Sequence, residues 1–179
     1  YKYAMKWVDM FNKQPEMIIS HPVFYLKGNN YLMESLLLIK YPAKFRDILK
    51  KLTLNIESLS FPKNDNIEAL SFLYYYNNRI NLYFLEGDFK KGLSLIETIN
   101  YKINQLKDRI DQHHIMVFYY KMACLYFGCE DYENTIVYLN KIISNKALKM
   151  REDLLCFSRV LNLVAHYEAG FDFHLERNL

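Results

Sequence analysis

Cysteine, glycine and proline are all scarce in this sequence of 179 residues, and each scarcity excludes a class of protein. The three cysteines, Cys124, Cys129 and Cys156, are too few, and odd in number, for a secreted scaffold held by disulfides. Five glycines and four prolines do not supply the turns of a many-stranded β architecture. No apolar run approaches the ~18 residues that span a bilayer. We therefore expect a cytoplasmic protein without a membrane partner.

Excess charge is lacking as well. The formal net charge at pH 7 is +3, which is too small to predict a nucleic-acid binder. A hydrophobic fraction of 51% and a charged fraction of 24% predict a folded chain, and its length suits one core or a short repeat array. Because the sequence begins at Tyr1 and ends at Leu179 inside a helical pattern, we expect it to be part of a longer protein.

The four prolines divide the chain, because they all precede residue 63. Residues 1–62 are therefore predicted to form short helices, at 2–13, 15–27, 30–40 and 42–59. Residues 63–179 are predicted to form longer ones. Asp65 followed by Glu68 has the shape of a capping box, which opens a helix that ends at Gly87. Apolar steps of three and four then predict one helix over 89–110, and nothing alternates with the period of a strand.

A short pattern recurs where these helices end. Residues 82–89 align with residues 125–132, and residues 165–172 form a weaker third copy, so that the spacing is 40–43 residues. A fainter trace around Gly28 would make a degenerate first copy. A period near forty that contains two helices is typical of an α-solenoid.

At these positions the chain resembles the tetratricopeptide repeat (TPR) family. That family has a tyrosine near the end of its first helix, a Gly-Asp-aromatic turn and small residues where the paired helices meet. The matching residues are Tyr83, Gly87-Asp88-Phe89 and Gly92, then Ala123, Tyr126, Glu130-Asp131-Tyr132 and Thr135. Tyr76 and Tyr119 replace the signature tryptophan, the closing proline is missing, and the spacing exceeds the usual ~34 residues. The chain also resembles large bacterial cytoplasmic proteins built from such divergent repeats.

The resemblance implies an all-α fold, in which antiparallel helix pairs stack as a short right-handed α-solenoid over residues 63–179. It implies a non-enzymatic scaffold without cofactors, whose concave face binds a protein or peptide through the first helix of each pair. The matching positions are Tyr74, Asn77, Asn78 and Asn81, followed by Tyr120, Lys121 and Cys124. Asparagine amides suit a peptide backbone, Lys121 suits a carboxylate, and tyrosines offer rigid contact area. The family's clamp for peptide tails carries more Lys and Arg, and the asparagines would equally suit the outer face of an ordinary helix.

Two other functions stay open. The chain could be a ligand-sensing regulatory domain of a longer protein. Nucleic acid could bind a basic helix face, although a solvated face explains the same residues: Lys40, Lys44, Arg46, Lys50 and Lys51.

No catalytic or metal site is predicted. Cys124 and Cys129 are five residues apart, which matches no zinc pattern. His113 and His114 project from different sides of a helix, and we expect them at its negative end, with Asp111 on another face. No phosphate-binding loop or hydrolase motif is present.

Overall fold

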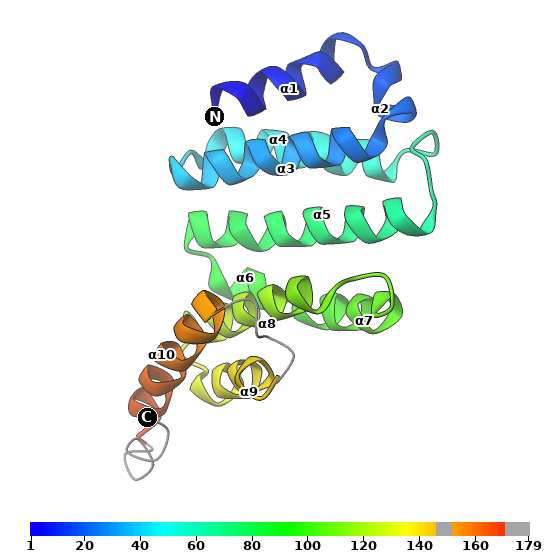
Figure 1. The fold of residues 1–179 in the computed structure, drawn as a ribbon. Helices are drawn as coiled ribbons and strands as arrows, with labels where there is room; N and C mark the ends of the chain where they lie inside the picture. Colours follow the sequence, from blue (N-terminus) through cyan, green and yellow to red (C-terminus); the bar gives the residue numbers. More distant parts are fainter. Residues whose placement is uncertain (146–151, 171–179) are drawn as a thin grey trace. The chain divides into compact units, whose positions relative to one another are not determined.

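The computed structural model describes residues 1–145 and 152–170, and within these ranges the chain forms α-helices and no strand, which confirms the all-α class. No helix in these ranges combines the length and the apolar character that a membrane span requires. In chain order the helices are α1 (Lys2–Lys13), α2 (Glu16–Ser20), α3 (Pro22–Leu38), α4 (Pro42–Glu57), α5 (Asp65–Glu86), α6 (Phe89–Leu93), α7 (Ile96–Leu106), α8 (Gln112–Phe127), α9 (Tyr132–Ile143) and α10 (Glu152–Glu168) (Figure 1).

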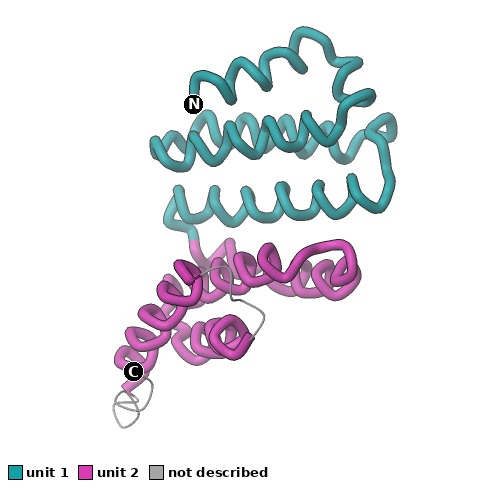
Figure 2. The backbone as a smooth tube through the Cα atoms, in the orientation of Figure 1, with its two compact units in different colours: residues 1–88 teal, residues 89–179 magenta. Residues whose placement is uncertain are grey.

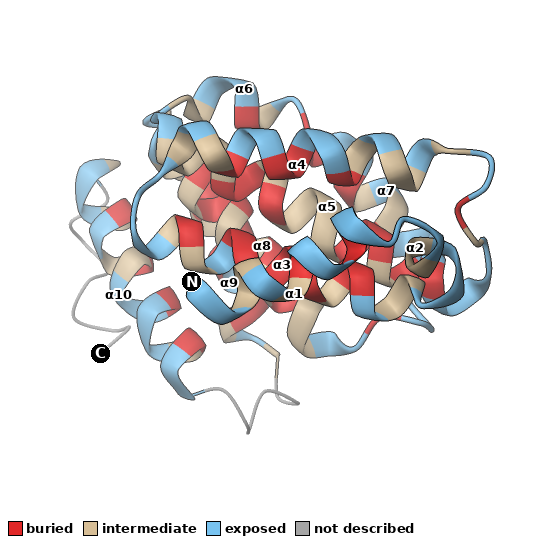
Figure 3. Ribbon diagram, turned by 90° about the horizontal axis from the view of Figure 1, so that it is seen from above, coloured by how far each residue is buried: buried red, intermediate tan, exposed pale blue. Residues whose placement is uncertain are grey.

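The chain divides into two compact units, Tyr1–Asp88 and Phe89–Leu179 (Figure 2). In the first unit, α1 and α4 run antiparallel to α3 and α5 (Figure 1). Helix α3 packs against α1, α4 and α5, and α4 also packs against α5. These helices turn their buried residues towards one another and their exposed residues outwards (Figure 3). The largest fully buried side chains of this core are Leu26, Leu32, Met33, Leu36, Phe45 and Leu52.

In the second unit, α8 packs against α6, α9 and α10, and α9 packs against α10. A Cβ atom added to Gly92 of α6 would lie 2.4 Å from Cδ2 of Leu125, so the approach of α6 to α8 requires glycine there. The buried hydroxyl of Thr135 in α9 donates to the Asp131 carbonyl at 2.8 Å and lies 3.4 Å from the Ala123 carbonyl of α8. Small residues that carried the family resemblance therefore do allow close helix packing.

One hydrogen-bonded corner ends three of the long helices. The backbone at Lys40, Gly87 and Glu130 is left-handed, with φ of 52°, 68° and 61°. In each case the next N–H donates, at 3.0 Å, to the carbonyl five residues earlier; the pairs are Tyr41 with Leu36, Asp88 with Tyr83, and Asp131 with Tyr126. This is the Schellman arrangement that satisfies the last carbonyls of a helix. Gly170, with φ of 74°, ends α10 in the same left-handed conformation.

The predicted boundaries in residues 15–40 are wrong. Instead of a break at Gly28, the chain breaks at His21, because Pro22 has no N–H to continue a helix and is placed at the start of α3. Gly28 lies inside α3, where its missing Cβ makes room for the indole of Trp7, 3.0 Å from the position such an atom would take. The trace around Gly28 is therefore no repeat corner, and the N-terminal corner lies at Lys40 instead.

Two further boundaries differ from the prediction. Asn64, and not Asp65, caps α5, because its side chain accepts the Ile67 N–H at 2.9 Å. The helix predicted over 89–110 is divided into α6 and α7. At this division Ser94 and Leu95 donate their N–H groups to carbonyls three residues earlier, at 3.2 and 3.1 Å, which forms a tighter turn than an α-helix.

Candidate functional site

A row of buried asparagines joins α3 to α5 and ends at an exposed carboxylate. The Asn81 amide donates to Oδ1 of Asn78 at 3.4 Å, and the Asn78 amide donates to Oδ1 of Asn30 at 2.8 Å. The Asn30 amide then donates to Oε1 of Glu34 at 2.9 Å. All three bonds point the same way, so the amides fix the position of the Glu34 carboxylate from within. We call this chain of Asn81, Asn78, Asn30 and Glu34 the amide relay.

Two tyrosines flank the carboxylate at the end of the relay. Burial raises the pKa of Tyr74, and the nearby Tyr31 and Glu34 raise it further. Tyr31 and Glu34 are exposed and lie three residues apart on one face of α3. Tyr31 is half exposed and its ring centroid lies 6.0 Å from that of Trp7. Glu34 is itself exposed, so its carboxylate lies at the surface. We call Tyr31, Glu34 and Tyr74 the acidic tyrosine site.

The structure separates the predicted asparagines. Tyr74 and Asn77 are partly exposed on α5, whereas Asn78 and Asn81 are 0% and 3% exposed. The prediction that Asn78 and Asn81 touch a partner is therefore wrong, because their side chains lie inside the molecule and bond within the amide relay. Asn30, Tyr31 and Glu34, which belong to α3, had not been singled out. A helical wheel of residues 22–38 shows that Glu34 shares a face with Asn30 and with Tyr31, four and three residues earlier, but not that Asn30 meets α5.

Tyr120 and Lys121 lie on α8, in the second unit, and both are partly exposed. Burial raises the pKa of Tyr120 to about 12, and its hydrogen bond with Cys124 contributes. Burial also raises the pKa of the Cys124 thiol to about 11, partly offset by the bond to Tyr120 and the charge of Lys121. Burial therefore favours the protonated thiol of Cys124 over the thiolate at neutral pH. The role predicted for Tyr120 and Lys121 stays a prediction.

The basic stretch is partly engaged within the first unit. The Lys44 ammonium donates to the Tyr1 hydroxyl at 3.1 Å and lies 5.6 Å from the centre of that ring. Arg46 pairs with Glu86 of α5. Lys40 occupies the left-handed corner between α3 and α4. The contacts of Lys44 and Arg46 tie α4 to the N-terminus and to α5. Part of the positive charge of the basic stretch therefore stabilises the first unit.

The two histidines occupy the first turn of α8, which corrects the expected position at the negative end of a helix. Asp111 caps α8 by accepting the His114 N–H at 2.9 Å, and its carboxylate also lies 2.8 Å from Nδ1 of His114. Asp111 and His114 are three residues apart and therefore share a face. In the described ranges, no three His, Cys, Asp or Glu residues are grouped as a metal site would require.

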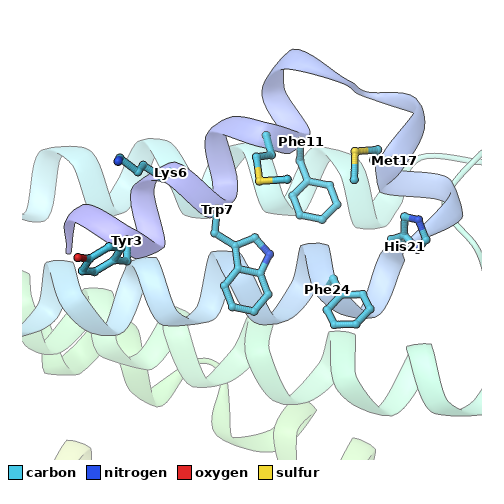
Figure 4. A pocket seen from close by; sticks show the side chains of 8 residues that line it. Tyr3, Lys6, Trp7, Phe11, Met17, His21 and Phe24 are labelled. Atoms are coloured by element: carbon cyan, nitrogen blue, oxygen red, sulfur yellow. The ribbon is translucent and has the colours of Figure 1, made fainter.

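An open apolar groove of about 540 Å³ runs along α1 and the start of α3 (Figure 4). Tyr3, Met10 and Phe24 are 85%, 55% and 56% exposed, which is unusual for large apolar side chains. The lining residues come from α1, α2 and the first turn of α3; they are Tyr3, Lys6, Trp7, Met10, Phe11, Met17, His21 and Phe24. The contact of Trp7 with Gly28 that shapes this groove joins distant residues, and so sequence reasoning missed it.

Comparisons with protein-family models, with curated proteins and with solved structures find no match to this chain.

Proposed function

We propose that this chain is a non-enzymatic, protein-binding helical repeat whose acidic tyrosine site holds a basic side chain of a partner segment. Its helix pairs are inferred to stack as a short right-handed α-solenoid of the TPR type. Two observations support this stacking. The same corner recurs at Lys40, Gly87 and Glu130. In the first unit, α3 packs against α4, the second helix of its pair, and against α5, the first helix of the next pair. In the second unit, α8 packs in the same way against α9 and α10.

The amide relay is the observation that carries the proposal. Buried amides cost free energy unless they are hydrogen-bonded. Three buried asparagines are therefore a less favourable contact between two helices than apolar side chains would be. The amide relay holds the Glu34 carboxylate at a fixed position on the surface, where one of its oxygens accepts a hydrogen bond from Asn30. A fixed carboxylate loses less conformational entropy on binding than a free one.

The chemistry of the site selects a cation. Glu34 supplies a negative charge, and the faces of Tyr31 and Tyr74 attract a cation placed over them. A guanidinium suits the site better than an ammonium, because it can stack on a tyrosine while donating two bonds to the carboxylate. Asn77 is partly exposed on α5 and lies three residues after Tyr74, on the same face, so we expect it to contact the same segment. The expected partner is thus a protein segment that presents an arginine.

Selection from a displayed peptide library tests the proposal. The immobilised chain should enrich peptides with an arginine, and calorimetry should show about tenfold weaker binding of these peptides to Glu34→Gln, which corresponds to about 1.4 kcal/mol. Glu97→Gln is the matched control, because Glu97 is exposed on α7 and its loss changes the net charge equally. Enrichment without basic residues, or equal loss in both variants, would contradict the proposal.

A further inference from the structure

The apolar groove lies where the packing order of the molecule calls for another helix. Helix α3 packs against α4 and α5 together, and α8 packs against α9 and α10 together. Helices α1 and α3 are in contact and antiparallel, as α4 and α5 are (Figure 1). On one side of α3, the Tyr25 hydroxyl accepts a bond from Asn55 of α4 at 2.7 Å, while the neighbouring Phe24 points into the groove. The pair α1 and α3 thus corresponds to the pair α4 and α5. Helix α3 packs against the second pair, and the groove lies at the equivalent place beside the first pair.

Helix α10 carries the apolar face that such a position needs. Phe157, Val160, Val164 and Tyr167 follow one another at steps of three and four, and are 60%, 55%, 40% and 65% exposed. We call them the α10 stripe. Like α3 and α8, α10 ends at a left-handed residue, and it has the same length as α3, 17 residues. An exposed stripe of this size on one helix is a binding surface rather than scattered surface apolarity.

The repeat corners give the register of the stripe. Asn30 lies ten residues before the corner at Lys40, and Asn78 lies nine residues before the corner at Gly87. These two side chains are in contact between parallel helices. By the same count, Val160 lies ten residues before Gly170, and Tyr31 lies nine before Lys40. Both are about half exposed, so Val160 is matched to Tyr31 of another copy.

The charged residues of α1 and α10 favour an orientation in which the docked helix runs parallel to α3. A helix that lies parallel to α3 in the groove has its C-terminal end beside the N-terminal end of α1. Helix α10 carries Glu168 at its C-terminal end, and α1 carries Lys2 and Lys6 at its N-terminal end, all three exposed. At the opposite end, Glu152 of α10 comes near Lys13 of α1. Opposite charges thus meet at both ends of the pairing.

We infer that the occupant of the groove is α10 of a second copy of this chain, which docks head to tail with its stripe against α1 and α3. The contact is heterologous, so each copy retains one free groove and one free stripe, and association grows into rings or filaments rather than stopping at a dimer. The inference goes beyond the proposed binding function and does not depend on Glu34. Because Tyr31 belongs to both surfaces, a docked copy and an arginine segment compete for that side chain.

Two single substitutions each disrupt one side of the contact between copies. Phe24→Glu places a charge in the groove and leaves the stripe intact, whereas Val160→Glu does the reverse. Both side chains are more than half exposed, so each variant should keep the helical circular dichroism of the parent. In sedimentation velocity, the parent should form species larger than a dimer as its concentration rises, and each variant alone should stay monomeric. An equimolar mixture should form a dimer that grows no further, because only one functional groove meets one functional stripe.

The register is tested separately by linking Val160→Cys to Tyr31→Cys of another copy with a short bismaleimide. The background replaces Cys129, which is partly exposed, and Cys156, which is exposed, by serine. A cross-linked dimer is expected, and Lys102→Cys in place of Tyr31→Cys should give none. A parent that stays monomeric at every concentration would overturn the inference. Growth of the Val160→Glu variant alone would overturn it too, since it would mean that the groove pairs with something other than the stripe.

Discussion

Single asparagine side chains link two helices of the first unit, because Asn30 and Asn78 each donate and accept a hydrogen bond within the relay. Asn78 is the centre of the relay: it donates to Asn30 and accepts from Asn81. It also donates to the Tyr74 carbonyl at 2.8 Å. Loss of this one side chain leaves two neighbouring buried amides short of a bond.

Replacement of Asn78 by alanine should therefore lower the free energy of unfolding by about 1–3 kcal/mol, the cost of buried groups left without partners. Urea denaturation monitored by circular dichroism measures this change. Asn104→Ala is the control, because Asn104 is exposed on α7. If the two variants lose the same stability, the relay contributes nothing to the fold.

The cysteines should differ in reactivity. Because burial raises the pKa of the Cys124 thiol to about 11, little thiolate exists at mildly alkaline pH, whereas Cys156 is exposed on α10. Iodoacetamide should alkylate Cys156 much faster than Cys124 in the folded protein, as peptide mass spectrometry would show. In urea the two rates should converge. Equal rates in the folded state would contradict the raised pKa and partial burial of Cys124.

The burial of individual asparagines could not be predicted from the sequence. Asn77, Asn78 and Asn81 look alike in the sequence, yet two are buried and one is partly exposed. The difference depends on Asn30, which lies 48 residues before Asn78 in the chain. Glu34 is bonded to Asn30 of its own helix, four residues earlier, but no local pattern shows that Asn30 is in turn bonded to α5. Tyr74 was singled out because the resemblance placed it on a first helix, and its role in binding stays a prediction.

At the scale of helices, the corners were the most predictable feature. Gly87 marks a corner plainly, because glycine adopts positive φ at no steric cost, and the homologous position at Glu130 was found through its neighbours Tyr126 and Asp131. The corner at Lys40 was missed, because it has neither glycine nor the following acidic residue. Pro22 was treated as a residue inside a helix, although proline favours the first turn.

Opposite effects are expected at two of these corners. Gly87→Ala should lower the free energy of unfolding by about 1 kcal/mol, because alanine disfavours φ of 68° and no atom within 4 Å adds a clash. Glu130→Gly should raise it by about 0.5–1 kcal/mol, since φ is 61° there. Thermal or urea unfolding measures both, and Glu130→Gln separates the effect of charge. A destabilised Glu130→Gly would show that its side chain matters more than its backbone.

The start of α8 should give a pH-dependent contribution to stability. Burial alone would raise the pKa of Asp111, but hydrogen bonds from the backbone and ring of His114, with the charges of His114 and His113, lower it below the ordinary 3.8. Because the folded pKa lies below the unfolded one, the stabilisation is complete above about pH 3.8 and is lost as the pH falls through the folded pKa.

Asp111→Ala should therefore cost about 1 kcal/mol at neutral pH, as the loss of an N-cap does, and less in strong acid. Asp111→Asn retains a capping oxygen and removes the titration, so its stability should change less with pH than that of the parent. Urea unfolding at neutral and acid pH compares the three proteins. A difference between the parent and Asp111→Asn that is the same at both pH values would exclude this source of pH dependence.

At the scale of the whole molecule, the fold class followed from the sequence because apolar residues recur with helical spacing and prolines stop after residue 62. The division into units at residues 88 and 89 did not follow the predicted boundary at residue 62, since α5 packs with α3 and α4 rather than starting a separate domain. A boundary signalled by proline is thus a break between helices, whereas a boundary between units depends on which helices share a core.

The most direct test of the account is nuclear magnetic resonance titration of the labelled chain with an arginine peptide obtained by the selection. The account predicts that backbone shifts concentrate around Tyr31, Glu34, Tyr74 and Asn77, that they saturate, and that they vanish when the arginine is replaced by norleucine or Glu34 by glutamine. Shifts confined to other helices, or unchanged by both replacements, would contradict the claim that a fixed carboxylate between two tyrosines is the binding site.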